Sequence, residues 1–276
     1  MKKRKIKFII FAILIIIISI WLTWETNSIV ITRIQYTNGK IPSEFYGYKI
    51  LQISDLHNKT FGKNQIKLLE KIKECNPDII VITGDLIDRK PEDINNSIEL
   101  IKNIPETLPI YYVSGNHESY TLHYGKIKEK LVMANVTVLD NESILLSKNG
   151  QVINLIGLID PNFYGKDNGP AKLNTELERL SNDDFFQILL CHRPELIDMY
   201  SNNNIDLVFT GHAHGGQIQL PYIGAIIAPD QGLFPKYTKG EYLKKNTTMI
   251  VNRGLGTTGI PIRIFDRPEI VLLELQ

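Results

Sequence analysis

The sequence predicts a layered α/β domain with a largely parallel inner sheet. Short apolar runs alternate with segments of helical periodicity, as the runs 48–54 and 79–83 do around the helical segment 64–74. The run 79–83 is apolar or β-branched at every position, which is typical of a strand buried on both faces. Because β-α-β units join parallel strands, the alternation predicts helices packed against a parallel sheet.

The remaining elements follow the same pattern to the end of the chain. We expect helices over 64–74, 93–103 and 174–180. We expect strands over 28–37, 48–54, 79–83, 110–114, 144–146, 152–159, 185–190, 206–210, 248–251, 260–264 and 270–275. The turn Lys148-Asn149-Gly150 joins two of these strands in a hairpin. No linker separates the two halves, so we predict one domain over residues 28–276.

The N-terminus predicts a membrane anchor. Residues 1–7 form a basic tail, and residues 8–24 then run for 17 positions without a charge, the short end of what spans a bilayer as a helix. Trp21 and Trp24 lie where an interfacial aromatic belt would be. A cleaved signal peptide is the alternative, but the apolar run is long for one and no small-x-small cleavage site follows it. We therefore expect a single-pass signal anchor in the cell membrane, with a cytoplasmic N-terminus and an extracytoplasmic domain.

The composition argues against a strongly charged partner. The net charge is +1, and the hydrophobic and charged fractions of 43% and 22% are those of an ordinary globular chain. No basic stretch beyond the N-terminal tail favours a nucleic-acid partner. Cys75 and Cys191 form no metal-type pair, and two buried free thiols fit better than a disulfide.

Polar clusters follow five of the predicted strands. Five of the six histidines lie in these clusters, whereas histidines used for packing or solubility would be scattered. Because ligands of open α/β sheets bind at the carboxyl ends of the strands, we expect these side chains to converge there. In Asp-x-His and His-x-His, positions i and i+2 fall on the same side of an extended segment. The clusters are Asp55 and His57, Asp85 and Asp88, Asn116 and His117, His192, and His212 and His214.

The ligand types predict a metal site. Imidazole and carboxylate together suit Zn, Mn or Fe rather than Ca or Mg alone. The side chains outnumber the ligands that one ion needs, which argues for two divalent ions that share a bridging carboxylate. Two ions about 3.5–4 Å apart clamp the attacking and leaving oxygens of an in-line phosphoryl displacement, and they make a hydroxide nucleophile at neutral pH. The clusters therefore predict a two-metal phosphohydrolase.

The order of the clusters resembles that of the calcineurin-like metallophosphoesterase family. All five family motifs occur in order between about Leu51 and Gly216. They are Asp55-Leu56-His57, Gly84-Asp85-Leu86-Ile87-Asp88, Gly115-Asn116-His117-Glu118, His192 and Gly211-His212-Ala213-His214. The longer stretch Gly215-Gly216-Gln217 and the late Arg253-Gly254-Leu255-Gly256 resemble a bacterial membrane-associated branch of the family. The resemblance implies a four-layer α/β/β/α sandwich of two mixed sheets.

The resemblance also implies a role for each cluster. The first metal would be held by Asp55, His57, Asp85 and His214, and the second by Asp85, Asn116, His192 and His212. His117 would not bind metal and would protonate the leaving alkoxide or stabilise its developing charge. The residue types agree with these roles, because a bridging ligand such as Asp85 needs two oxygens. The neutral amide of Asn116 limits the negative charge that a phosphate would meet.

Four further residues have two interpretations each. Asp88 and Glu118 either orient a histidine through its other ring nitrogen or serve a turn or cap. Arg193 and Arg253 either bind a second substrate phosphate or form surface ion pairs.

The expected function is hydrolysis of a phosphate ester, on a small-molecule substrate or a lipid-linked or envelope substrate. A lipid-linked or envelope substrate is suggested only by the expected position of the domain beside the membrane. A catalytically silent metal-binding scaffold is an alternative, but it would show broken ligand positions, and none is broken here. A phosphodiesterase of the nuclease type would need a basic, aromatic-lined groove, which the near-neutral charge argues against. No protein partner is indicated.

Overall fold

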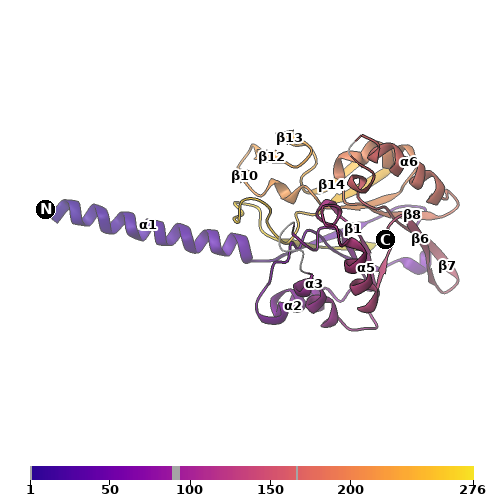
Figure 1. Ribbon diagram of the computed structural model, residues 1–276, viewed down its shortest axis with the longest axis horizontal. Helices are drawn as coiled ribbons and strands as arrows, with labels where there is room; N and C mark the ends of the chain where they lie inside the picture. The colour runs from indigo at the N-terminus through magenta and orange to yellow at the C-terminus, as the bar shows by residue number, and fades with distance from the viewer. Residues whose placement is uncertain (1, 89–93, 166) are drawn as a thin grey trace.

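The protein is an N-terminal helix followed by a four-layer α/β/β/α sandwich (Figure 1). The computed structural model describes residues 2–88, 94–165 and 167–276. In these residues two six-stranded mixed sheets pack face to face, and helices cover the outer face of each sheet. The predicted fold class is confirmed.

The first sheet contains the strands of the N-terminal half of the domain and the last strand of the chain. Its order is β1 (Val30–Tyr36), β16 (Glu269–Leu275), β2 (Lys49–Ile53), β3 (Ile79–Thr83), β4 (Ile110–Val113) and β5 (Val136–Val138). Strands β2 to β5 are parallel, whereas β16 is antiparallel to β2. The helices on its outer face are α2 (Ile66–Cys75), α3 (Asn95–Lys102) and α5 (Tyr124–Met133).

The second sheet comes from the C-terminal half of the chain. Its order is β14 (Gly240–Lys244), β15 (Thr247–Val251), β9 (Leu207–Thr210), β8 (Phe186–Leu190), β7 (Gln151–Gly157) and β6 (Glu142–Lys148). The four inner strands are parallel, and the two edge strands are antiparallel to their neighbours. Its outer face carries α6 (Gly169–Leu180) and α7 (Ile197–Asn202).

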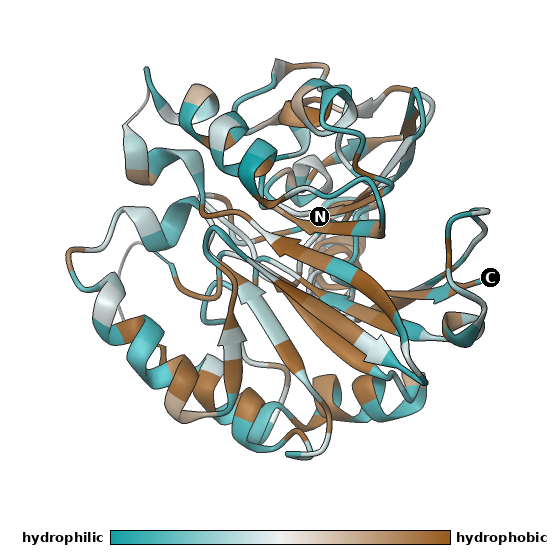
Figure 2. Ribbon diagram, turned by 90° about the vertical axis from the view of Figure 1, so that its right-hand side faces the viewer, coloured by the Kyte–Doolittle hydropathy of each residue, from teal (hydrophilic) through white to brown (hydrophobic). Residues whose placement is uncertain are grey.

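Burial on both faces explains the uninterrupted apolar runs. Along β3, Ile79 and Val81 belong to the core between the sheets, and Ile80 and Ile82 belong to the core beneath the helices. Figure 2 shows the strands as hydrophobic bands, and the helices that cover them are hydrophobic in part. The parallel inner strands of both sheets end toward the same edge of the sandwich, where His192 after β8 lies beside Asp85 after β3.

Most expected elements form, with one error. The predicted strand over 260–264 is wrong, because within the described ranges only Ile264 pairs, through a bridge to Ile218. Pro261 lacks an N–H for a ladder, and the Arg263 side chain turns inward. The sequence reasoning also missed β5 and β14 of the two sheets and the covering helices α5 and α7. The expected hairpin turn forms between β6 and β7. Cys75 and Cys191 are buried and free, as expected. Asp93 of the expected helix 93–103 lies outside the described residues.

The N-terminal helix α1 (Lys2–Asn27) extends away from the sandwich (Figure 1). Among the described residues, Lys3–Asn27 is the stretch of helix long and apolar enough to cross a membrane, judged by length and composition. Its last turns contact the domain. The centre of the Trp21 ring lies 5.2 Å from that of the Phe265 ring. The backbone N–H of Arg263 donates to Oγ1 of Thr26.

Candidate metal centre

The five polar clusters lie at the carboxyl ends of strands from both sheets. In the first sheet they follow β2, β3 and β4, and in the second they follow β8 and β9. Asn116 and His117 begin the short helix α4 (Asn116–Ser119), and His214 begins the 3-10 turn His214–Gly216. The clusters meet where the two sheets face each other, so ligands far apart in the chain come together.

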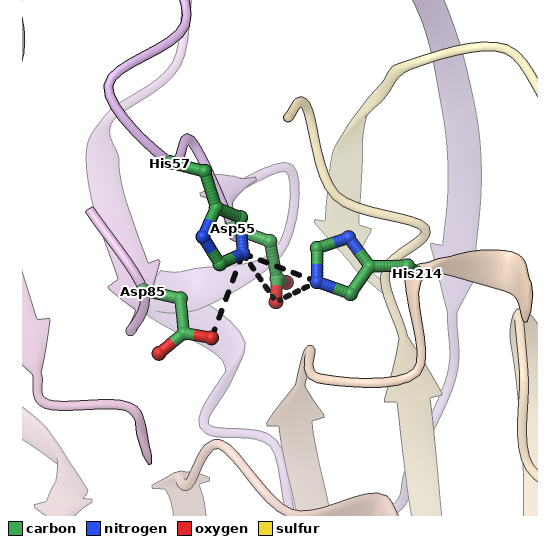
Figure 3. A group of neighbouring side chains, drawn as sticks. All are labelled: Asp55, His57, Asp85 and His214. Atoms are coloured by element: carbon green, nitrogen blue, oxygen red, sulfur yellow. Dashed lines mark hydrogen bonds and ion pairs between the residues drawn. The ribbon is translucent and has the colours of Figure 1, made fainter. Parts of the chain in front are cut away.

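The first group of side chains brings together Asp55, His57, Asp85 and His214 (Figure 3). All four are buried, and their ligand atoms lie within 4.8 Å of one another. Nε2 of His57 lies 3.1 Å from Nε2 of His214, which lies 3.3 Å from Oδ1 of Asp55. Nε2 of His57 also lies 3.6 Å from Oδ2 of Asp85.

This geometry fits a cation. Two ligand atoms that are each about 2.1 Å from one ion lie roughly 3.0–3.4 Å apart at octahedral or tetrahedral angles. The spacings of His214 from His57 and from Asp55 fall in this range. Nδ1 of His57 and Nδ1 of His214 have no hydrogen-bond partner within the described part of the chain. The nitrogens that face each other are Nε2 of His57 and Nε2 of His214, and beside two carboxylates they form a donor set suited to a divalent metal.

A second group adjoins the first through Asp85. It comprises Asp85, His192 and His212. Nε2 of His192 lies 3.3 Å from Oδ2 of Asp85 and 3.0 Å from Oδ1 of Asn116. On the other side of the ring, Nδ1 donates to the carbonyl of Thr83 at 2.7 Å, which aims Nε2 at the group. The same oxygen of Asp85 thus faces both groups.

The ligand loops are held in left-handed turns. Five of the predicted ligands, all within the described ranges, have positive φ: Asp55 at 51°, His57 at 48°, Asp85 at 53°, His212 at 66° and His214 at 51°. The expectation that i and i+2 converge along an extended segment is therefore wrong, although the side chains do converge. Non-glycine residues with positive φ store strain, which is common where a site fixes its side chains.

Close backbone packing supports these turns. Gly84 has φ 88°, and a Cβ there would lie 2.5 Å from the Gly115 nitrogen. A Cβ on Gly115 would lie 2.2 Å from Oδ1 of Asp85. The loops after β3 and β4 can therefore touch only because both positions are glycine.

Burial and nearby carboxylates set the charge of the histidines. Burial lowers the pKa of His57 to about 4, and it also lowers the pKa values of His212 and His214. These rings are neutral near pH 7, which is the form that binds a metal. Burial would lower the pKa of His192 as well, but the Asp85 and Asp55 carboxylates outweigh it and raise that pKa to about 10.

The two predicted carboxylates beside the site have different contacts. Oδ1 of Asp88 lies 3.1 Å from Nδ1 of His117, within ion-pair distance of the ring. The Glu118 carboxylate instead accepts backbone hydrogen bonds from Gly115, Asp85, Leu86 and Ile87. These hydrogen bonds join the loop after β3 to the loop after β4.

The two predicted arginines are both paired. Arg193 is buried, and its Nε and Nη2 donate to the two oxygens of Asp160 at 2.6 and 3.0 Å. Its Nη1 contacts Asp230 and lies 3.0 Å from Nε2 of His212. The ion pair is therefore buried rather than on the surface. Nη2 of Arg253 donates to Glu269 at 2.9 Å, and that pair is partly buried.

The sequence reasoning missed three residues that support the centre. Asp160 follows the strand-like run 152–159 just as the other clusters follow theirs, so its position carried a usable signal. Asp230 lies in a loop without such a signal. Arg263 is fully buried and donates to carbonyls of Gly256 and Asp266. A lone arginine in an apolar segment gives no sign of this role.

Comparison with known proteins agrees with the geometry. The sequence profile of the calcineurin-like phosphoesterase family matches residues 48–216. The uncharacterized metallophosphoesterase YkuE of Bacillus subtilis is 34% identical over 91% of this chain and 87% of its own length. The uncharacterized metallophosphoesterase Cj0846 of Campylobacter jejuni is 30% identical over 97% of this chain and 70% of its own length.

Two further comparisons concern the anchor and the fold. A bovine transmembrane protein with a metallophosphoesterase domain is 29% identical over 89% of this chain and 57% of its own length. The crystal structure of TT1561 of Thermus thermophilus shares the fold with a TM-score of 0.51 and 15% identity, over 75% of this chain and 90% of that one. The chain belongs to the calcineurin-like phosphoesterase family, whose members depend on metal, and it is a hydrolase of phosphoester bonds.

Proposed function

We propose that the protein is a membrane-anchored phosphohydrolase whose centre holds two divalent metal ions, of Mn, Zn or Fe. The observation that carries this proposal is the position of Asp85, whose Oδ2 lies 3.6 Å from Nε2 of His57 and 3.3 Å from Nε2 of His192. One carboxylate oxygen between two ligand groups suits a bridge between two ions. The first set would be Asp55, His57, Asp85 and His214, and the second Asp85, Asn116, His192 and His212.

The residues around the centre have separate tasks in phosphoester hydrolysis. Two bound ions would polarise the ester and lower the pKa of a water molecule. Asn116 contributes a neutral oxygen, which limits the negative charge of the site and therefore its repulsion of a phosphate anion. His117 donates a proton to the leaving oxygen through Nε2, and Asp88 holds the ring through Nδ1. The left-handed turns at Asp85 and His214 would keep these ligands in place before the substrate arrives.

Anchoring by α1 is supported by its contacts with the domain. Glu25 and Thr26 are buried, and the Thr26 carbonyl contacts the Lys59 ammonium. A segment that packs into the folded domain is suited to be retained as an uncleaved signal anchor. The basic residues before the span favour a cytoplasmic N-terminus and an extracytoplasmic domain. This placement favours a lipid-linked or envelope phosphate ester as the substrate, over a soluble small molecule.

The test uses the full chain in detergent, because α1 packs against the domain. The protein is stripped of metal, supplied with Mn, Zn, Fe or Mg singly, and assayed on an aryl phosphomonoester and an aryl phosphodiester. Asp85→Asn is assayed in parallel, with His123→Gln, an exposed histidine outside the clusters, as the control. We expect metal-restored turnover that Asp85→Asn loses and His123→Gln keeps. Turnover that needs no metal, or that survives in Asp85→Asn, would contradict the proposal.

The substrate class has a separate test. Detergent-dispersed lipid phosphates and soluble esters are compared as substrates at equal phosphate concentration. We expect a higher kcat/KM for the lipid phosphates. If they are hydrolysed no faster than the soluble esters, the lipid-linked assignment is wrong, while the two-metal assignment stands.

A further inference from the structure

Two loops beside the metal centre expose an unusual amount of apolar surface. The segment 217–235 has 19 residues and a single charge, at Asp230, and the segment 256–262 has no charge. Surface loops are normally polar, and contiguous apolar patches mark interaction sites. We call the exposed side chains of these loops the apolar rim: Tyr222, Ile223, Ile227, Leu233, Phe234 and Ile260 are each more than half exposed.

The apolar rim lies at the end of the domain from which α1 departs. Figure 1 shows β10 (Gln219–Leu220), β12 (Ile227–Ala228) and the C-terminal loop, drawn in yellow, on that side. Ile218 pairs with Ile264, and the neighbouring Phe265 packs against Trp21 of α1. Both loops are therefore joined to the last turns of the apolar helix.

The charged side chains Asp230 and Arg263, in and beside these loops, are paired or buried, although the Asp230 side chain is 52% exposed. Asp230 contacts Arg193 and accepts from His212 at 3.0 Å, and Arg263 has no exposed surface. Burying the apolar rim in a nonpolar phase would therefore require no desolvation of an unpaired charge. Lys236 and Lys239, just beyond the first loop, are exposed and suited to lipid phosphates.

Aromatic and basic groups surround the base of α1. The Arg267 guanidinium lies 4.6 Å from the centre of the Trp24 ring. Tryptophan and basic side chains together are typical of the headgroup level of a bilayer. A cavity between α1 and α2 is lined by Ser19, Ile20, Thr23, Trp24, Lys67 and Lys71. In a chain anchored by α1, these groups would lie at the headgroup level, with the apolar rim beside them.

We propose that the apolar rim is a second membrane-docking surface and that its partner is the lipid bilayer that α1 enters. The first loop continues directly from the turn that carries His214, and its Asp230 contacts His212. Docking of the rim therefore holds the metal centre beside the bilayer surface and orients the domain about its single anchor. The inference uses α1 as the anchor, as in the proposed function.

The test measures how deeply labelled side chains lie in a bilayer. The full chain is placed, one copy per disc, in nanodiscs of phosphatidylcholine and phosphatidylglycerol. Tyr222→Cys and Phe234→Cys are labelled with an environment-sensitive fluorophore, with Leu145→Cys on β6, an exposed apolar residue at the far end, as the matched control. The unmodified chain gives the background from the buried Cys75 and Cys191.

The proposal predicts blue-shifted emission and at least several-fold stronger quenching by doxyl lipids at Tyr222 and Phe234 than at Leu145. Equal quenching at all three positions would overturn it. Shielding that appears only with two copies per disc would also overturn it, because the rim would then cover a second copy of the chain. A label at Ile13→Cys, in the middle of α1, reports the anchor separately. Quenching there without quenching at the rim would contradict docking but leave the anchor intact, whereas no quenching at Ile13 would contradict both.

Discussion

Oδ1 of Asp88 lies 3.1 Å from Nδ1 of His117, close enough for the two side chains to form an ion pair when the imidazole is protonated. In this arrangement the proton for a leaving group comes from Nε2. His117→Gln should lower kcat on an alkyl phosphate by about 10²–10⁴-fold. The loss should be much smaller on a nitrophenyl phosphate, whose leaving group needs no proton. Asp88→Asn should act in the same direction and more weakly.

These assays need matched metal content, measured on each preparation. If His117→Gln slows both esters equally at full metal content, His117 does not act as the general acid. If it also loses metal, it belongs to the ligand set instead.

Metal binding should release a proton from His192. Its pKa is raised to about 10, so the ring carries a proton at pH 7.5 and must lose it to bind a metal. Affinity should therefore fall as the pH falls, by up to about tenfold per unit from this residue. Calorimetric titration with Mn in two buffers of different ionisation enthalpy measures the released protons. On metal binding, we expect His192→Asn to release about one proton fewer than the unmodified chain.

The control for this titration is His123→Gln, which should release as many protons as the unmodified chain. Heats that are the same in both buffers for the unmodified chain would show that no proton leaves. The assignment of His192 as a charged residue in the metal-free protein would then be incorrect.

The buried pair of Arg193 and Asp160 should stabilise the fold. Arg193→Met leaves the Asp160 carboxylate buried without its partner, which costs about 3–5 kcal/mol of unfolding free energy. The matched control is Arg179→Met, which removes an exposed i,i+3 pair with Glu176 and should cost less than about 1 kcal/mol. Urea unfolding of the metal-free full chain in detergent measures both. Similar losses for the two variants would rule out a structural role for the buried pair.

Much of the centre could be predicted from the sequence because its residues follow apolar strands directly. Asp85 comes after an apolar run whose strand character is unmistakable, and the same holds for His192 and His212. The contacts among loops could not be predicted in this way. Asp230 meets Arg193 across 37 positions of the chain, and no local pattern fixes such a pair.

The backbone conformation of the ligand loops could not be predicted from the sequence either. The left-handed residues Asp55 and His57 donate their backbone N–H groups to the carbonyls of Gly84 and Asp85 in the next loop, which are tertiary contacts. The alternating apolar residues over 260–264 predicted a strand that does not form. There Arg263 is drawn inward by the carbonyls of Gly256 and Asp266, and the segment forms a loop.

If Asp85 joins two metal ions, the bound metals should interact magnetically, which a metal count with spin resonance detects. The full chain is reconstituted with Mn(II), and bound metal is measured together with its electron paramagnetic resonance spectrum. We expect two ions per chain with the multiline spectrum of a coupled pair, and loss of that coupling in Asp85→Asn. A single ion per chain, or two ions with the six-line spectrum of isolated Mn(II), would contradict it.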